Sequence, residues 1–349
     1  MPGVQPGRLV LIDIVAANPS GVCLAANPRG IRLDPVGGKA LQVIKANPAF
    51  DLPREKTKSY FSRGDLHFSQ NVHLSFVCGA GGDTLPTGGP SLRSLYIAHT
   101  LERQTTGIVC VRAETATTEL LRQLEERERT NLAHFEKLIA ETVDSILIFP
   151  ESPGSFAELG FFSAFESISK KTLVAVREEF QDNSFISLGP IHYISSISGF
   201  KPTPIAIGLD YTAGFDRISN RLVRPDRVRP YRERFEKKAE WKEHSTRHQL
   251  ALLDEIIEVT GALTEPDLKS VISDIFGKYD ISLVRMLLSL LVAMNRIKRN
   301  INGDIFSTGE GMPFMECDSD ERTSLKARWL ASYQASQPET LKELRGFEK

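Results

Sequence analysis

The stretch 144–165, DSILIFPESPGSFAELGFFSAF, contains the change from strand to helix on which the fold depends. Its first residues form an apolar, β-branched run that is typical of a strand buried on both faces. A turn rich in Pro, Gly and Ser follows, and apolar residues then recur at helical spacing. This unit predicts one step of an α/β fold, and its turn brings Glu158 into the first turn of the helix.

The same alternation of strand and helix continues on both sides of this unit. It implies right-handed crossovers and a parallel sheet covered on both faces. We therefore predict a flavodoxin- or Rossmann-like α/β fold, in which ligands bind beyond the carboxyl ends of the strands. The expected strands are 71–82 (which runs into a Gly-rich turn), 107–114, 144–150, 171–176 and 190–197. The expected helices are 91–104, 115–143 and 155–168.

The C-terminal part of the chain has a different pattern. Short helical segments lead to an Asn-Gly pair at 302–303, which is a strong signal for a two-residue hairpin turn. Helices followed by a hairpin favour a helical, winged-helix-like domain that binds nucleic acid or protein. A small helical domain that only packs or oligomerises explains the pattern equally well. The basic residues expected to contact a phosphate backbone are Arg296, Lys298 and Arg299.

The segment 217–247 is basic, with eleven Lys or Arg and five Asp or Glu. Such a surplus fits a solvated connector or a surface for phosphate-bearing partners. The predicted organisation is an N-terminal extension at 1–70, the α/β domain at 71–215, a basic helical connector at 216–263, and the winged-helix-like domain with its tail at 264–349.

The composition, 41% hydrophobic and 25% charged, is that of a globular protein and disfavours several other classes. No apolar run reaches the roughly 18 residues of a membrane span, and no convincing signal peptide is present. The cysteines form no CxxC pair and the histidines have no metal-ligand spacing, so neither a disulfide framework nor a metal site is expected. We therefore expect a cytoplasmic protein that binds no metal and no membrane.

Two interpretations of Glu158 compete. Ser155 and Glu158 have the Ser-x-x-Glu spacing of a capping box, with Ser155 as the N-cap. Alternatively, an ionised glutamate at the ligand edge of a parallel sheet can attack an anomeric carbon or stabilise an oxocarbenium ion. Pro153 and Gly154 would shape a turn whose backbone amides approach the ligand. The two roles are compatible in different states of one site.

Further candidates for substrate binding lie near the same edge. Glycines after the first strand let the backbone approach a phosphate or a ribose. Arg93 would pair with a pyrophosphate and Glu114 with a ribose hydroxyl, although each also fits an exposed structural role. The candidate substrate-binding residues are Gly79, Gly81, Gly82, Arg93, Glu114, Glu151, Gly154 and Ser155.

The pattern ILIFPESPGSFAELGFF (146–162) resembles the nucleoside 2-deoxyribosyltransferase-like N-glycosidase domains, and most closely those of the effector toxins encoded beside bacterial retrons. The resemblance covers about residues 71–200, with VCGAGG as the first strand and its loop and SPGSFAELG as the signature. In these families a Glu on the helix after this strand is catalytic, which implies that role for Glu158.

The resemblance implies a toxin effector of a retron anti-phage system. Such effectors are held inactive by the retron reverse transcriptase and its msDNA, a branched DNA–RNA product. The implied reaction is hydrolysis of an N-glycosidic bond, with NAD or a related nucleotide as substrate and no separate cofactor. Retron effectors also carry a C-terminal winged-helix-like domain, as the pattern of 264–308 independently favours.

The chain departs from two related patterns. Deoxyribosyltransferases tend to place an Asp in the loop after the third strand, where this chain has Glu151, and this favours hydrolysis over deoxynucleoside exchange. The phosphoribohydrolases that activate cytokinins have the signature PGGxGTxxE, of which PGSFAE at 153–158 lacks the second Gly and the Gly-Thr spacing.

Two alternatives from other functional classes remain open. One is a nucleotide-sensing, DNA-binding regulator in which Glu158 only caps its helix. The other is a structural subunit of a nucleoprotein complex, bridged by the basic segment 217–247. The regulator predicts that Glu158→Gln leaves ligand binding and partner binding nearly intact, with no turnover to lose. Purification from the native operon with nucleic acid attached would support the structural subunit.

Overall fold

The computed structural model describes residue 44 and residues 47–347, apart from 64, 82–84, 86–87, 104–106, 124–130, 179–183, 224–232, 238–239 and 301. The chain divides into two units, 1–37 and 38–349, and all described residues belong to the second. Most of the predicted N-terminal extension therefore lies outside the described residues. Its described end forms a short 3₁₀ helix (Pro48–Phe50) and helix α1 (Asp51–Tyr60).

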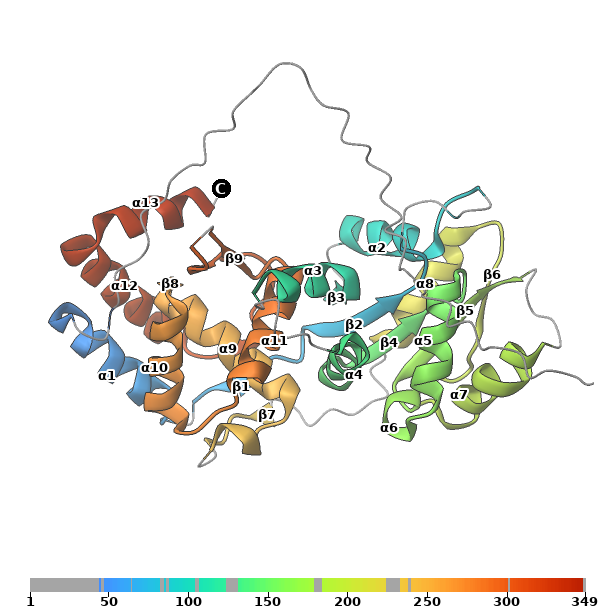
Figure 1. The fold of residues 1–349 in the computed structure, drawn as a ribbon, viewed down its shortest axis with the longest axis horizontal. Coiled ribbons are helices and arrows are strands. Elements are labelled where there is room, and N and C mark those ends of the chain that lie inside the picture. Colours follow the sequence, from blue (N-terminus) through green and yellow to red (C-terminus); the bar gives the residue numbers. More distant parts are fainter. Residues whose placement is uncertain are drawn as a thin grey trace, which may run out of the picture. The chain divides into compact units, whose positions relative to one another are not determined.

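A five-stranded parallel sheet confirms the α/β prediction (Figure 1). Its order is β3-β2-β4-β5-β6, so the chain starts next to one edge, adds β3 at that edge, and returns past β2 to add β4, β5 and β6 in sequence. The central strands are buried along their whole length, as their continuous apolar runs predict. The strands are β2 (His73–Cys78), β3 (Ile108–Val111), β4 (Ser145–Ile148), β5 (Thr172–Arg177) and β6 (Ile205–Ile207).

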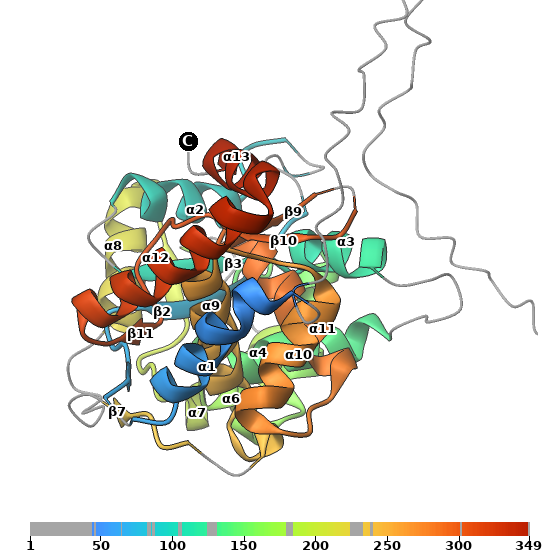
Figure 2. The ribbon, with the colours of Figure 1, turned by 90° about the vertical axis from the view of Figure 1, so that its left-hand side faces the viewer.

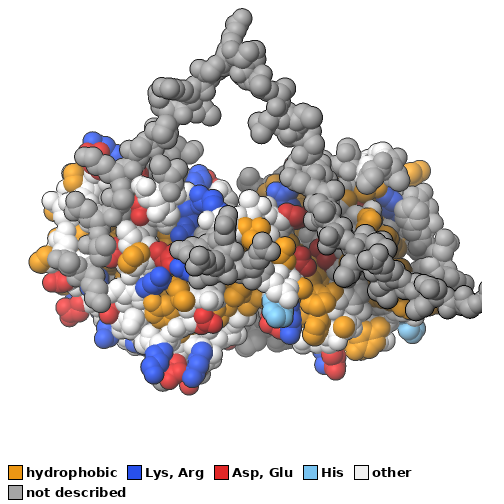
Figure 3. Space-filling view, in the orientation of Figure 1, with side chains coloured by type: hydrophobic (Ala, Val, Ile, Leu, Met, Phe, Trp, Pro, Cys, Tyr) orange, Lys and Arg blue, Asp and Glu red, His pale blue; other side chains and the backbone are white. Residues whose placement is uncertain are grey.

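Helices cover both faces of the sheet. One face packs on α2 and α8, through Tyr96 and Phe215, and the other packs on α4 and α5, through Phe135 and Phe162. Hydrophobic side chains also gather on the surface over α5 and α6 (Figure 3). The helices are α2 (Leu92–Glu102), α3 (Ala113–Gln123), α4 (Leu132–Thr142), α5 (Pro153–Ser163), α6 (Glu166–Ser169), α7 (His192–Ile197) and α8 (Tyr211–Leu222).

Two predicted elements are wrong. The expected strand at 190–197 is helical, because its buried residues Ile191 and Ile194 recur at a spacing of three rather than two; a π-helical turn (Ser187–Ile191) leads into α7. The fifth strand is β6 instead. The single helix expected at 115–143 is also wrong, because the side chain of Asn131 caps a new helix, α4, by accepting a hydrogen bond from Ala133 N.

A second, antiparallel sheet of order β8-β10-β9 lies in the C-terminal part of the chain. The predicted hairpin is confirmed, but Asn300 and Asp304 pair, which leaves a three-residue loop that ends at Gly303, with φ +81°. The elements are α9 (Thr246–Thr260), β8 (Ala262–Leu263), α10 (Glu265–Phe276), α11 (Ile281–Ala293), β9 (Ile297–Arg299) and β10 (Ile305–Ser307).

A third sheet joins segments that are far apart in the sequence. Its order is β11-β1-β7, and both pairings are antiparallel. Helix α1 packs against α12 beside it (Figure 2). The remaining elements are β1 (His67–Phe68), β7 (Glu233–Arg234), a 3₁₀ turn (Trp241–Glu243), β11 (Met315–Glu316), α12 (Ser319–Ser336) and α13 (Pro338–Phe347).

Candidate active site

The loops after β2 and β4 meet at the carboxyl edge of the parallel sheet. The two strands are neighbours, and Cys78 pairs in register with Ile148. The chain that follows β4 turns through Glu151 and enters α5, while the chain that follows β2 leads to α2. Helices that follow parallel strands begin at this edge, so the N-termini of α2 and α5 both lie there.

Glu151 closes the N-terminus of α2. Its carboxylate accepts hydrogen bonds from the Ser91 hydroxyl (2.7 Å) and from the backbone N–H groups of Leu92 (2.8 Å), Arg93 (3.2 Å) and Ala80 (3.2 Å). The first N–H groups of a helix have no partner within the helix, and a carboxylate there satisfies them. Glu151 thus has a structural role in the arrangement described, and its contact with a substrate stays a prediction.

Gly79 is required by the close approach of these two loops. A Cβ atom at this position would lie 2.6 Å from Cβ of Arg93 and 3.0 Å from a carboxylate oxygen of Glu151. At Gly81 an added Cβ would have more room, 3.9 Å from a Glu114 oxygen. Gly82 lies outside the described residues. The glycines at 79 and 81 therefore border the site, but only Gly79 is sterically enforced.

The capping box predicted for Ser155 and Glu158 is wrong. The N-cap of α5 lies three residues earlier, at Ser152, and Pro153 occupies the first helical position, where its fixed φ suits a helix start. Ser155 is the N3 residue, and its hydroxyl accepts hydrogen bonds from the backbone N–H groups of Ser152 and Glu151. Gly154, in the same first turn, is exposed. Glu158 therefore does not cap α5, because Ser152 and Ser155 form the capping box.

The carboxyl of Glu158 is half-buried beside two other carboxylates. Burial raises the pKa of Glu158 to about 7, and Glu136 and Glu114 act in the same direction, while Cys78 and Arg93 lower it. Among the described residues, Oε2 of Glu158 is buried and has no hydrogen-bond partner. A carboxyl that is costly to ionise and has an unused oxygen is suited to accept positive charge from a ligand.

Cys78 and Arg93 complete the surroundings of this carboxyl. The Cys78 thiol is buried at the end of β2 and hydrogen-bonds Glu158, and burial raises its pKa well above the usual value, so it stays protonated. Arg93 is 5% exposed and pairs with Glu114 at 2.5 Å, which joins α2 to α3. The Nε of Arg93 is buried without a hydrogen-bond partner among the described residues. One cation, Arg93, and three carboxylates, from four helices, thus lie around one strand end.

Glu136 was missed in the sequence. It lies on α4, next to the buried Phe135, and its own pKa is raised by burial and by Glu114. The Asn131 cap was the available signal, because a helix that starts there and precedes β4 must begin at the carboxyl edge of the sheet. Interpreting 115–143 as one helix hid this placement.

The three basic residues predicted to bind nucleic acid lie on or beside β9. Arg296 is buried and contacts both carboxylate oxygens of Asp254 at 3.0 and 2.7 Å. Arg299 is 4% exposed and interacts with Glu265 and Glu119. Lys298, between them, is half-buried. Contact of the two arginines with a phosphate backbone would require these ion pairs to break.

Within the described part of the chain, no group of three or more His, Cys, Asp or Glu side chains is placed to hold a metal ion. No helix there is long and apolar enough to cross a membrane.

Comparison with known proteins gives three matches. The model of a family described as STM3845 retron effector protein matches residues 89–299. A protein of Escherichia coli named "Retron Ec73 putative ribosyltransferase/DNA-binding protein" is 30% identical over 249 residues, which cover 66% of this chain and 76% of that protein. Another, "Retron Ec86 putative ribosyltransferase/DNA-binding protein", is 43% identical over 65 residues, which span only 18% of this chain and 21% of that protein.

Proposed function

This chain belongs to the STM3845 family of retron effector proteins, and on this premise we propose that it is an N-glycosidase with Glu158 as its catalytic carboxylate. The name ribosyltransferase, given to its Escherichia coli relatives, describes chemistry at a ribose anomeric carbon and supports this class. The observation that carries the proposal is the Glu158 carboxyl itself, with a pKa raised to about 7 and an unpaired oxygen at the ligand edge of the sheet.

In the proposed reaction an oxygen of ionised Glu158 attacks the anomeric carbon or stabilises the oxocarbenium ion, while the bond to the ring nitrogen breaks. The electron pair of that bond leaves with the nitrogen. In NAD this neutralises the cationic nicotinamide ring, so that no general acid is needed. Water then adds to the anomeric carbon and loses a proton, which gives ADP-ribose and nicotinamide and restores Glu158.

The acidic surroundings of Glu158 favour a cationic substrate. The charges of Glu136 and Glu114 oppose ionisation of Glu158, and a positive ring beside them would reverse that effect. Binding of the nicotinamide cation would therefore lower the pKa of Glu158 and produce the nucleophile. Arg93, bound to Glu114 at the same edge, is in reach of the anionic pyrophosphate in this proposal.

We assign the reaction to the predicted domain at 71–215, with a sheet of the nucleoside deoxyribosyltransferase-like kind. Glu151 occupies the place where deoxyribosyltransferases tend to have an Asp, and its carboxylate is engaged in closing α2. The chain then has no equivalent of that Asp, which supports hydrolysis rather than deoxynucleoside exchange.

We assign a winged-helix-like unit to the C-terminal part. The order α9-β8-α10-α11-β9-β10 supports it and starts the unit earlier than the predicted residue 264.

The proposed partners are the retron reverse transcriptase and its msDNA, which would hold the toxin inactive. The words "DNA-binding" in the relatives' names support a nucleic-acid partner. Helix α11 packs against α3, which carries Glu114 of the candidate site, and Arg299 interacts with Glu119 of the same helix. A partner that binds the C-terminal unit could therefore affect the active site by shifting α3.

The experiment that tests the proposal is nicotinamide release from NAD by the purified protein, measured by chromatography beside a panel of nucleosides and deoxynucleosides. Release by the wild type that falls at least about 100-fold in Glu158→Gln is the expected result, since the carboxylate is the reacting group. Addition of the reverse transcriptase with its msDNA should suppress release.

Glu166→Gln, an exposed carboxylate on α6, is the matched control and should keep full activity. Release from a nucleoside instead of NAD would keep the mechanism and change the substrate. If the folded protein cleaves nothing, with and without its partners, the N-glycosidase proposal is wrong and the nucleotide-sensing regulator takes its place.

A further inference from the structure

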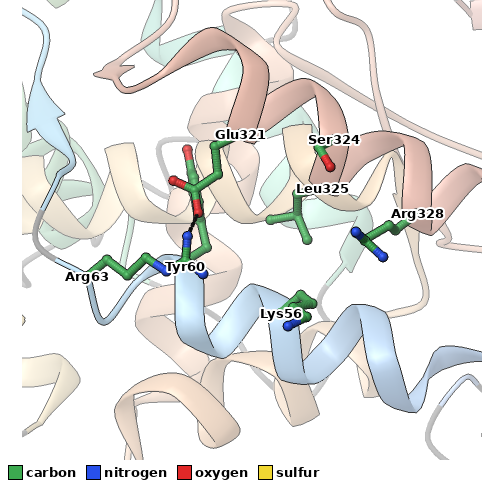
Figure 4. A pocket seen from close by; sticks show the side chains of 7 residues that line it. All are labelled: Lys56, Tyr60, Arg63, Glu321, Ser324, Leu325 and Arg328. Carbon is green, nitrogen blue, oxygen red and sulfur yellow. Dashed lines mark hydrogen bonds and ion pairs between the residues drawn. The ribbon is translucent and has the colours of Figure 1, made fainter.

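A cavity between α1 and α12 is built from residues that take no part in the candidate active site. It has a volume of about 220 Å³. Pockets that enclose a whole drug-sized ligand measure roughly 300–1,000 Å³, so this cavity fits one compact group rather than a complete nucleotide. Its lining residues are Lys56, Tyr60, Arg63, Glu321, Ser324, Leu325 and Arg328 (Figure 4).

The cavity has a surplus of positive charge. Glu321 is the carboxylate of the lining and forms an ion pair with Arg63. Lys56 and Arg328 are exposed and, among the described residues, have no hydrogen bond or ion pair. Figure 4 shows the Arg63–Glu321 pair on one side of the cavity, Arg328 on the other, and Lys56 on α1 between them. Two uncompensated cations in one concave site attract an anion.

Buried contacts fix the two helices that carry these cations. Thr57 follows Lys56 on α1, Trp329 follows Arg328 on α12, and the Trp329 indole donates a hydrogen bond to the Thr57 hydroxyl at 3.0 Å. Tyr60 faces inward and donates a hydrogen bond to Glu255 at 2.7 Å. The spacing of α1 and α12 is therefore set by the core, and the backbone positions from which the two cations extend are fixed.

The positive charge extends beyond the cavity. The Lys237 ammonium donates a hydrogen bond to the hydroxyl of Ser62, the residue next to Arg63. The pKa of Lys237 is lowered by partial burial and by the ammonium of Lys58, which therefore lies close to it. A free phosphate ion would use only the cavity, whereas a strand with regularly spaced phosphates would also reach these further cations.

We propose that the cavity between α1 and α12 binds a backbone phosphate of a nucleic-acid strand. Lys56 and Arg328 neutralise the phosphate, the Ser324 hydroxyl donates to one of its oxygens, and the strand continues toward Lys58 and Lys237. Contacts of this kind position a strand without reading its sequence. The site does not depend on N-glycoside cleavage, because none of its residues lies near Glu158 in the candidate active site.

The test is binding of a fluorescein-labelled oligothymidylate to the full-length protein, followed by fluorescence anisotropy between about 50 and 200 mM salt. The double variant Lys56→Gln/Arg328→Gln is compared with Lys170→Gln/Lys342→Gln, which removes the same charge from exposed positions at the C-cap of α6 and on α13. The slope of log K against log salt should decrease in magnitude by about 0.7 in the first variant, because each neutralised phosphate of a single strand contributes about 0.7 and the two cations share one phosphate.

Equal affinity and equal slope in the wild type and Lys56→Gln/Arg328→Gln would overturn the proposal, as would an equal loss in the control. Inorganic phosphate is titrated separately by calorimetry. Lys56→Gln/Arg328→Gln could lose saturable phosphate binding while its oligothymidylate binding is unchanged. That result would overturn the proposal that a nucleic-acid strand binds here and would assign the cavity to a free phosphate ion. Nicotinamide release should be the same in both double variants, so failure here is distinct from failure of the proposed reaction.

Discussion

The carboxyl of Glu158 ionises less readily than a glutamate in water, because burial removes its hydration and Glu136 and Glu114 repel a further negative charge. These residues belong to three helices, α5, α4 and α3. The arrangement costs the folded protein stability as the pH rises above the ordinary value of 4.5, and the full cost is reached above about pH 7, where Glu158 is charged. Such a cost is typical of a site that is complementary to a cationic ligand or transition state.

The pH dependence of the proposed reaction follows from this arrangement. Activity that needs ionised Glu158 should rise as the pH increases through about 7. Glu136→Gln removes one repelling charge, so the pKa of Glu158 falls and the acid limb of the kcat/KM profile should move to lower pH. The profile of nicotinamide release measures this shift.

Glu141→Gln is the matched control, since Glu141 lies on the same helix, α4, with its side chain 46% exposed. Its profile should coincide with that of the wild type. An acid limb that stays in place in Glu136→Gln, or that moves equally in both variants, would contradict the proposed coupling between Glu136 and Glu158.

At the scale of single elements, the starts of two helices organise the candidate site. Ser152 and Pro153 fix the first turn of α5 and leave Glu158 further along the helix. Glu151 closes the first turn of α2, which places Arg93 against Glu114. The four hydrogen bonds to Glu151 thus connect the loop after β4 with the position of the guanidinium.

Glu151→Ala should destabilise the fold and weaken activity together. The substitution leaves the N–H groups of Ala80, Leu92 and Arg93 without their carboxylate, which costs about 1–3 kcal/mol of unfolding free energy. Urea unfolding of the two proteins measures this difference. Glu102→Gln, at the exposed C-terminal end of the same helix, should change stability by less than about 0.5 kcal/mol. Equal stability of Glu151→Ala and the wild type would show that Glu151 does not hold α2.

At the scale of the whole described chain, a row of acidic residues on α9 joins distant segments. Asp254 pairs with Arg296 of the turn before β9, Glu255 with Arg322 of α12, and Glu258 with Lys326 of the same helix. Arg296 is therefore part of the contacts that α9 makes with the rest of the chain. Breaking a buried pair leaves a charge without compensation, which is much more costly than losing an exposed one.

Arg296→Gln should lower the unfolding free energy by about 3–5 kcal/mol, because Asp254 remains buried and charged without its partner. Thermal unfolding measures the loss. Adding Asp254→Asn to this variant removes the isolated charge and should recover part of the lost unfolding free energy. Lys298→Gln, on the adjacent strand β9, should cost less than about 1 kcal/mol. A stable Arg296→Gln protein that has lost oligonucleotide binding would instead assign Arg296 to nucleic-acid contact.

Local patterns in the sequence were sufficient for much of the fold. The apolar runs of β2, β4 and β5 predicted buried parallel strands, and Asn302-Gly303 predicted the hairpin, although with a loop one residue too short. The position of Glu158 at the carboxyl edge also followed from sequence, because it depends only on the order strand, turn and helix. The prediction for 190–197 was wrong because short apolar runs fit strand and helix alike; the spacing of three between its buried residues Ile191 and Ile194 fits a helix.

The sequence by itself determined the alternation of elements and the presence of one carboxylate at the ligand edge, because both depend on residues close together along the chain. Only the tertiary structure decided which charges meet: Glu136 and Glu114 beside Glu158, Glu151 on α2, and Arg296 on Asp254. The physical reason is that burial and charge pairing depend on contacts between segments tens to hundreds of residues apart, and no local periodicity records them.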